Sequence, residues 1–257
     1  MDLTGPQPLR ELRLDRDGQA VIDDRLISAL HQGLDAAEAD PDCRLVVLTS
    51  APGTFCTGMD LTAVGAAPAP SSQPPAAAGA AGEAGGAFFD LLRRFTSTPR
   101  IVVSAVDGQV AGGGLGLIGA SDLVCATERS TFALPEALWG LLPCCVLPFL
   151  IRRTGFQQAY AMALTTQPAD AARALACGLA DMVADDPGRQ LRRLAFRASK
   201  LDPATIGALK RYASRLWEIS DSTRQLAVTE LGRVMARPAV RQNLAAYAAR
   251  GRFPWER

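Results

Sequence analysis

The chain has 257 residues, 48% of them hydrophobic, and its 27 Lys and Arg residues balance 26 Asp and Glu residues, for a net charge of +1. With positive and negative charges nearly equal, the chain has no excess of positive charge to attract nucleic acid. No apolar run reaches the roughly 18 residues that a membrane span needs. The N-terminus lacks the apolar segment of a signal peptide, so we expect a cytoplasmic globular protein with neither nucleic acid nor membrane as a partner.

The first part of the chain alternates short strands and helices. Apolar and charged residues alternate in "RELRLDR" (10–16), which predicts a half-exposed strand, and a helix is predicted over 22–39. The β-branched run "CRLVVLTS" (43–50) predicts a second strand, and the Gly- and Pro-containing segment 51–61 is a loop. Residues 66–86 are rich in Ala, Pro, Gly and Ser, and we expect a mobile loop because so little side chain can be buried there.

The middle of the chain repeats this alternation around a glycine triplet. A helix is predicted over 87–97 and ends at Pro99, and "RIVVSAVDG" (100–108) reads as an apolar strand. The triplet follows, and a short helix is predicted over 113–120. The segments "DLVCATERS" and "TFALPE" then predict two further short strands.

From residue 146 onward, apolar residues recur mainly at helical spacing. We therefore predict an α/β core over residues 1–190, followed by a helical C-terminal region over 191–257.

Two glycine-containing turns and one glutamate suggest a reactive site. "FCTGMDL" (55–61) and "QVAGGGLGL" (109–117) each follow a strand, and two such loops can bring backbone N–H groups to one point, as in an oxyanion hole. The helix after the triplet adds the positive end of its dipole. Glu136 has apolar neighbours in "TFALPEALWG", which should raise its pKa toward neutrality, as a general base requires. Glycines used only for turns or packing are the alternative interpretation.

The cysteine and histidine content excludes several other mechanisms. His31 is the single histidine, so Ser-His-Asp and Cys-His catalysis and a His-rich metal site are not expected, and no metal is predicted. The six cysteines form no CxxC pair and are read as small buried hydrophobic residues.

Three segments together resemble the signatures of one enzyme family. "FCTGMDL", "SAVDGQVAGGGLGLIGASDLVCATERSTFALPE" and "AARALACGLADMVA" are similar, in order and spacing, to the enoyl-CoA hydratase/isomerase (crotonase) superfamily over about residues 11–190. The resemblance implies an α/β spiral of repeated ββα units. It also implies homotrimers or hexamers in which the helical C-terminal region packs at the trimer interface.

The resemblance assigns roles residue by residue. The oxyanion-hole amides fall on Met59 and Gly113, and a catalytic glutamate falls on Glu136. The family's other catalytic glutamate corresponds to Gly116, so this chain departs from the two-carboxylate pattern of classical hydratases. Proton abstraction next to a thioester is the shared chemistry that remains. Neighbouring positions are assigned to substrate binding: Cys56, Asp60, Leu61, Gly112, Trp139 and Cys144. A cap for Asp60 and a core position for Trp139 are the structural alternatives.

A narrower resemblance concerns residues 135–168 and the ending "FPWER". These are similar to the first crotonase-type enzyme of polyketide β-branching cassettes. The resemblance implies a hydro-lyase that dehydrates 3-hydroxy-3-methylglutaryl-ACP to 3-methylglutaconyl-ACP, where ACP is an acyl carrier protein. A partner decarboxylase of the same family would act next. No cofactor is implied beyond the phosphopantetheine of the carrier, or coenzyme A.

Other functions compete with this prediction. Within the family, the alternatives are the 3-methylglutaconyl-ACP decarboxylase and an enoyl-CoA hydratase or isomerase; outside enzymes, the alternative is a catalytically silent scaffold. Arg93, Arg94, Arg152 and Arg153 are either solvated helix residues or a surface for an acidic carrier protein.

Overall fold

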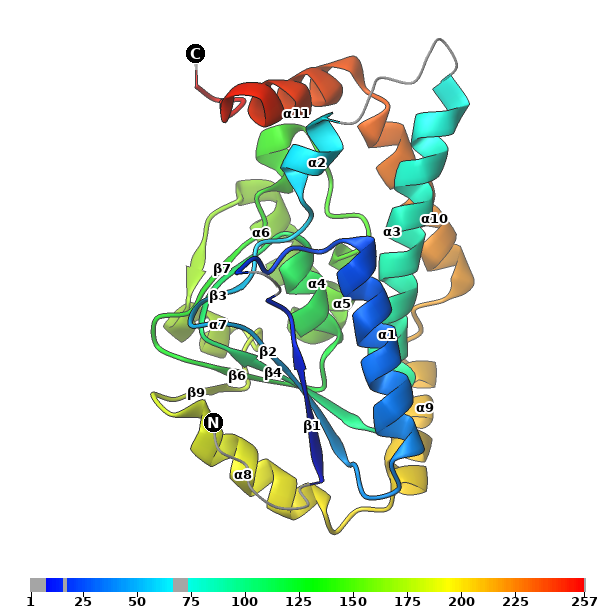
Figure 1. The fold of residues 1–257 in the computed structure, drawn as a ribbon, viewed down its shortest axis with the longest axis vertical. Coiled ribbons are helices and arrows are strands. Elements are labelled where there is room, and N and C mark those ends of the chain that lie inside the picture. The colour runs from blue at the N-terminus through cyan, green and yellow to red at the C-terminus, as the bar shows by residue number, and fades with distance from the viewer. Residues whose placement is uncertain (1–7, 16–17, 67–73, 257) are drawn as a thin grey trace.

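The computed structural model describes residues 8–15, 18–66 and 74–256. Its main sheet is parallel, with the strand order β1-β2-β4-β6-β9 (Figure 1). The strands are β1 (Leu9–Arg13), β2 (Leu45–Thr49), β4 (Ile101–Val106), β6 (Leu123–Ala126) and β9 (Met182–Val183). The central strands carry continuous β-branched runs because helices cover both faces of a parallel sheet.

A second sheet has the order β3-β5-β7-β8. Its strands are β3 (Gly53–Cys56), β5 (Gly108–Ala111), β7 (Thr131–Ala133) and β8 (Ala169–Asp170), and only β8 is antiparallel to its neighbour. Each of the consecutive pairs β2–β3, β4–β5 and β6–β7 gives one strand to each sheet. A helix follows each pair, which is the predicted repetition of ββα units.

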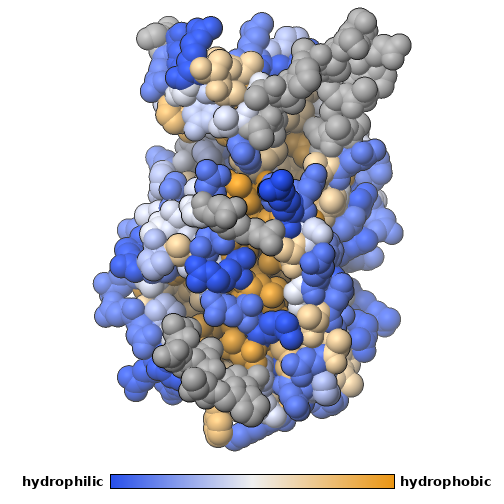
Figure 2. Space-filling view, in the orientation of Figure 1, coloured by the Kyte–Doolittle hydropathy of each residue, from blue (hydrophilic) through white to orange (hydrophobic). Residues whose placement is uncertain are grey.

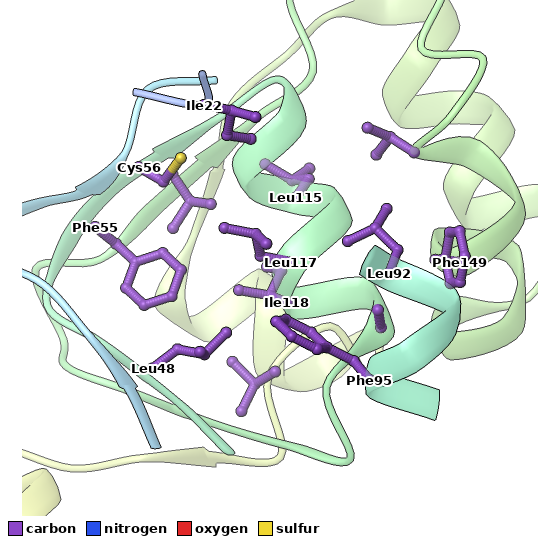
Figure 3. Close-up of a cluster of buried hydrophobic side chains, with 14 of the residues drawn as sticks. Ile22, Leu48, Phe55, Cys56, Leu92, Phe95, Leu115, Leu117, Ile118 and Phe149 are labelled. Atoms are coloured by element: carbon purple, nitrogen blue, oxygen red, sulfur yellow. The ribbon is translucent and has the colours of Figure 1, made fainter. Parts of the chain in front are cut away.

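Helix α4 (Gly113–Ala120) lies at the centre of the core (Figure 3). From Gly114 to Ala120 every one of its residues is buried. Helix α1 (Asp24–Ala39) and helix α3 (Pro74–Ser97) contribute to the same core, α3 with the buried side chains of Leu92 and Phe95. The predicted helices over 22–39 and 113–120 are confirmed to within two residues.

The chain then becomes helical. Its later helical elements are η1 (Glu136–Trp139), α5 (Leu147–Thr154), α6 (Phe156–Thr165), α7 (Ala171–Ala176), α8 (Pro187–Ala198), α9 (Pro203–Leu216), α10 (Asp221–Met235) and α11 (Pro238–Arg250). Helix α8 packs Leu191, Ala195 and Ala198 against the main sheet. Helix α10 lies along α3, and α11 lies on the short helix α2 (Leu61–Ala66).

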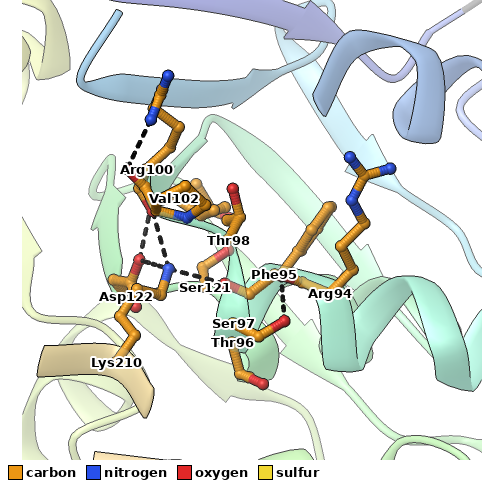
Figure 4. A network of polar contacts seen from close by, with 12 residues as sticks. Arg94, Phe95, Thr96, Ser97, Thr98, Arg100, Val102, Ser121, Asp122 and Lys210 are labelled. Atoms are coloured by element: carbon orange, nitrogen blue, oxygen red, sulfur yellow. Dashed lines mark hydrogen bonds and ion pairs between the residues drawn. The ribbon is translucent and has the colours of Figure 1, made fainter. Parts of the chain in front are cut away.

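A buried lysine ties α9 to the core (Figure 4). Lys210 Nζ donates to the carbonyl oxygens of Phe95 and Arg100, each at 2.8 Å, and to Asp122 Oδ2 at 2.6 Å. Asp122 Oδ2 also accepts from the N–H of Val102, near the start of β4. One ammonium group thus joins α9 to the end of α3 and to the main sheet.

The prediction of a mobile loop over 66–86 is wrong for residues 74–86, because these residues belong to α3, which begins at Pro74. Residues 67–73 of the predicted loop lie outside the described residues. The glycines of α3 allow close packing: a Cβ on Gly85 would lie 2.5 Å from Leu231 Cδ2, and one on Gly82 would lie 3.3 Å from Val228 Cγ1. Contact with α10 therefore stabilises a helix that composition alone does not favour.

In the part of the chain that the structure describes, no helix is long and apolar enough to cross a membrane. Figure 2 shows apolar side chains in a strip down the middle of one face, with hydrophilic residues on either side.

Candidate functional site

The two glycine turns predicted to meet lie backbone to backbone. Gly58 follows β3 with φ of +86°, and a Cβ there would lie 3.0 Å from the Ala111 carbonyl oxygen and 3.1 Å from the Gly113 nitrogen. Both the positive φ and the close approach favour glycine. The loop after β3 therefore contacts the junction between β5 and α4.

The directions of two backbone amides follow from the hydrogen bonds of their peptide planes. The carbonyl oxygen of Gly58 accepts from the N–H of Ile22 at 2.8 Å, so in this trans peptide the N–H of Met59 points the opposite way. The carbonyl oxygen of Gly112 accepts from the N–H of Leu115 at 2.9 Å. The N–H of Gly113, in the same trans peptide, therefore points away from Leu115. Gly113 is the first residue of α4, where an N–H has no acceptor within the helix. Both amides can therefore donate to a ligand.

Glu136 lies against the first glycine of the triplet. Gly112 has φ of +53°, and a Cβ there would lie 3.4 Å from Glu136 Oε1 and 3.8 Å from the Gly58 Cα. The carboxyl group, the loop after β3 and the start of α4 thus converge on one place.

The other two glycines of the triplet have a packing reason. A Cβ on Gly113 would lie 2.6 Å from Ile22 Cδ1, and one on Gly114 would lie 2.7 Å from the Cys56 carbonyl oxygen. Close packing therefore explains why Gly113 and Gly114 have no side chain. At Gly112, the absence of a side chain lets the Glu136 carboxyl group lie next to the backbone.

The carboxyl group of Glu136 is enclosed. Its Oε2 is buried and has no hydrogen-bond partner among the described residues. Burial disfavours the charged form and raises the pKa of Glu136 from its ordinary 4.5 to about 7, which matches the prediction from the sequence. An unpaired buried oxygen destabilises the fold and is uncommon in proteins, and a catalytic role is one explanation for it. A carboxyl group with this pKa can accept and return a proton near neutral pH.

Gly116 lies on apolar side chains. A Cβ there would be 3.0 Å from Leu92 Cδ1 and 3.2 Å from the ring of Phe88. The position that the resemblance assigns to a second carboxylate is therefore closed by two residues of α3. Phe88 is a residue of this site that the sequence analysis missed, because its helical pattern reads as ordinary core.

The loop residues after Gly58 are partly exposed. Met59 is 40% exposed, and Leu61 packs at the edge of the cluster around Trp139. Asp60 Oδ1 accepts from the N–H of Thr62 at 2.9 Å, at the start of α2, so the capping alternative holds for this side chain.

Two of the residues predicted to bind substrate have buried side chains. The Cys56 side chain is completely buried, and burial raises the pKa of its thiol to about 12. The Trp139 ring is also buried, in a cluster with three aromatic residues of the C-terminal segment: Tyr247, Phe253 and Trp255. Both side chains thus pack in the core, and the assignment of these two positions to substrate binding stays a prediction.

The adjacent cysteines differ in exposure. Cys144 is half-buried and Cys145 is buried, with its Sγ 3.4 Å from the Gly85 carbonyl oxygen. Burial raises the pKa of Cys144 to about 11 and that of Cys145 to about 12. Both thiols stay protonated at neutral pH, and Cys144 retains exposed surface with which it can line a pocket.

The four arginines considered for a carrier protein have intramolecular partners. Arg152 donates to the Gly119 carbonyl oxygen and Arg153 to that of Ser121, near the C-terminal end of α4. Arg93 pairs with Asp221, and Arg94 pairs with Asp35. All four side chains thus have intramolecular contacts, and a carrier-protein surface that includes them stays a prediction.

The family follows from the whole chain. A model of the enoyl-CoA hydratase/isomerase family matches residues 7–257, so the chain belongs to this family. Its relatives are named as hydratases and dehydratases, which places it among the hydro-lyases.

One relative agrees with the narrower resemblance, and another represents the wider family. The bacillaene synthase dehydratase PksH of Bacillus subtilis is 32% identical over 91% of this chain and 88% of that protein. The enoyl-CoA hydratase EchA19 of Mycobacterium tuberculosis is 31% identical over 70% of this chain and 66% of that protein.

Solved structures share the fold. The crystal structure of the polyketide biosynthesis enoyl-CoA hydratase PksH from Bacillus subtilis has a TM-score of 0.85 and 29% identity, and the match covers 96% of each chain. An enoyl-CoA hydratase from Mycobacterium avium has a TM-score of 0.83 and 29% identity, covering 99% of each chain. The predicted crotonase fold and the resemblance to polyketide dehydratases are confirmed.

Proposed function

We propose that this protein dehydrates 3-hydroxy-3-methylglutaryl-ACP to 3-methylglutaconyl-ACP in polyketide β-branching. The observation that carries the proposal is the enclosed carboxyl group of Glu136, which lies against Gly112 with a pKa of about 7. The similarity to PksH, which is named as a dehydratase of bacillaene synthase, supports a polyketide context.

The thioester oxygen is held by the N–H groups of Met59 and Gly113 in this mechanism. The ionised Glu136 removes a proton from C2, and the C–H electron pair moves into an enolate whose oxygen the two amides stabilise. Loss of one such donor typically lowers the rate by about 10²–10³. The helix dipole of α4 adds to this stabilisation at its N-terminus.

The same carboxyl group completes the elimination. The enolate electrons form the C2–C3 double bond as the C3–O bond breaks, and the protonated Glu136 gives its proton to the departing hydroxyl. Water leaves, and Glu136 is ionised again. One carboxyl group suffices, in agreement with the apolar surroundings of Gly116.

The substrate brings its own carrier in this proposal. The acyl chain is attached to the phosphopantetheine of an acyl carrier protein, or to coenzyme A, and the reaction needs no metal or other cofactor. A decarboxylase of the same family would consume the product.

We also propose a homotrimer or hexamer. Helix α9 and the residues around it carry large apolar side chains that are more than half exposed in the single chain: Leu209, Tyr212, Leu216, Trp217 and Leu226. Apolar surface of this kind is typical of a protein–protein contact. Sedimentation at micromolar concentration distinguishes these assemblies from a monomer.

The test of the activity supplies the purified protein with 3-hydroxy-3-methylglutaryl thioesters of both ACP and coenzyme A. Mass spectrometry of the acyl group then detects loss of water or of CO₂. We expect loss of water, and we expect Glu136→Gln to lower the rate at least about 10³-fold while Glu128→Gln, the same change at an exposed glutamate, leaves it unchanged.

Two other results would contradict this proposal. Loss of CO₂ from a separately supplied 3-methylglutaconyl thioester, without dehydration of the 3-hydroxy-3-methylglutaryl thioesters, would identify the partner decarboxylase. Inertness toward both substrates, together with hydration of crotonyl-CoA, would identify an enoyl-CoA hydratase.

A further inference from the structure

One aromatic ring lies across the first turn of α4. A Cβ on Gly116 would be 3.2 Å from Cε1 and Cζ of Phe88, and a Cβ on Gly113 would be 3.7 Å from the same two atoms. Phe88 is 7% exposed and belongs to α3, which packs against α4. Its ring therefore borders the residue whose N–H we assign to the thioester oxygen.

The candidate site thus has two chemically different sides. The Glu136 carboxyl lies at Gly112, and the Phe88 ring lies at Gly113 and Gly116. Because a thioester held at the Gly113 amide places its C2 and C3 atoms within a few ångströms of that residue, the acyl chain has a proton acceptor on one side and an apolar wall on the other. A phenyl ring offers no hydrogen bond to a hydroxyl group or to water, but it packs well against a methyl group.

We propose that Phe88 is a specificity-determining residue, whose ring packs against the alkyl branch at C3 and favours branched over unbranched 3-hydroxyacyl thioesters. The inference rests on the proposed function and adds the selection of the acyl chain. One methyl group in an apolar pocket changes kcat/KM by about 10- to 200-fold, which sets the scale of the preference.

Gly116 fixes the position of this wall. An alanine there would place its methyl group 3.0 Å from Leu92 Cδ1 and 3.2 Å from the Phe88 ring, both closer than ordinary van der Waals contact. Gly116→Ala must therefore displace the ring or Leu92, although neither residue changes chemically. The substitution alters the shape of the wall and leaves Glu136 and both amides in place.

The test compares kcat/KM for 3-hydroxy-3-methylglutaryl and 3-hydroxyglutaryl thioesters on the same carrier. In Phe88→Leu we expect the preference for the branched substrate to fall about 10-fold. Phe95→Leu is the matched control, because Phe95 is also buried on α3 but lies at the end of the helix near Lys210. In this control the ratio should stay at the wild-type value.

The ratio within one variant does not depend on how much of the protein is folded. If Phe88→Leu does not fold, Gly116→Ala supplies the same comparison and should also lower the ratio. A ratio that stays at the wild-type value in the folded variants would overturn the inference and leave the proposed dehydration intact. Wild-type protein that dehydrates neither thioester would overturn both.

Discussion

The raised pKa of Glu136 has a consequence for stability that does not depend on the substrate. The carboxyl group titrates at about 7 in the folded protein and near its ordinary 4.5 in the unfolded chain. Between these values the folded state binds more protons than the unfolded state, so the free energy of unfolding falls as the pH rises. At about 1.4 kcal/mol per pH unit, the loss is about 3 kcal/mol in total.

Glu136→Gln removes this titration and keeps the size of the side chain. We expect the variant and the wild type to differ little at pH 4.5, and we expect the variant to become more stable than the wild type by about 3 kcal/mol at pH 8. Urea unfolding at several pH values and one fixed protein concentration measures the difference.

The control for this experiment is Glu128→Gln, at an exposed position. Its unfolding free energy should follow that of the wild type across the whole range. Parallel curves for Glu136→Gln and the wild type would refute the reasoning, because they would show that the carboxyl group titrates alike in both states.

Two further predictions concern activity and the buried lysine. Because Glu136 must be ionised to take the C2 proton, kcat/KM should rise tenfold per pH unit below about 7 and level off above it; a pH–rate profile that is flat from pH 5 to 8 would exclude this base. Lys210→Met leaves Asp122 without its ammonium partner, and urea titrations should show a free energy of unfolding that is lower by about 3–5 kcal/mol. The control Lys200→Met, at an exposed site, should change the free energy of unfolding by less than about 0.5 kcal/mol.

Local sequence patterns predicted the parts of the fold that local chemistry determines. The β-branched runs of β2 and β4 form buried parallel strands, and the glycine triplet begins a helix at Gly113. The apolar neighbours of Glu136 were sufficient to predict the direction of its pKa shift. In each case the decisive neighbours are close in the sequence.

The failures depend on contacts between distant segments. Residues 74–86 form a helix because Gly82 and Gly85 admit side chains of α10, which lies far along the chain. Trp139, for which a core position was the alternative prediction, is buried because Tyr247 and other aromatic residues of the C-terminal segment pack on it. Composition and spacing around these positions carry no signal of such partners.

The candidate site also combines residues found by local sequence patterns with a residue whose position depends on contacts between distant segments. Met59, Gly113 and Glu136 were predicted from motifs, and their catalytic roles stay predictions, whereas the role proposed for Phe88 depends on the packing of α3 against α4. A phenylalanine in a helical apolar pattern is indistinguishable from any other core residue until its neighbour is known to be Gly116.

The most direct test of the account is a crystal structure of Glu136→Gln with its 3-hydroxy-3-methylglutaryl thioester bound. We predict that the thioester oxygen lies about 2.7–3.1 Å from the backbone nitrogens of both Met59 and Gly113, with the residue 136 side chain beside C2. A thioester oxygen bound away from these two amides, or a C2 atom out of reach of residue 136, would contradict the central claim.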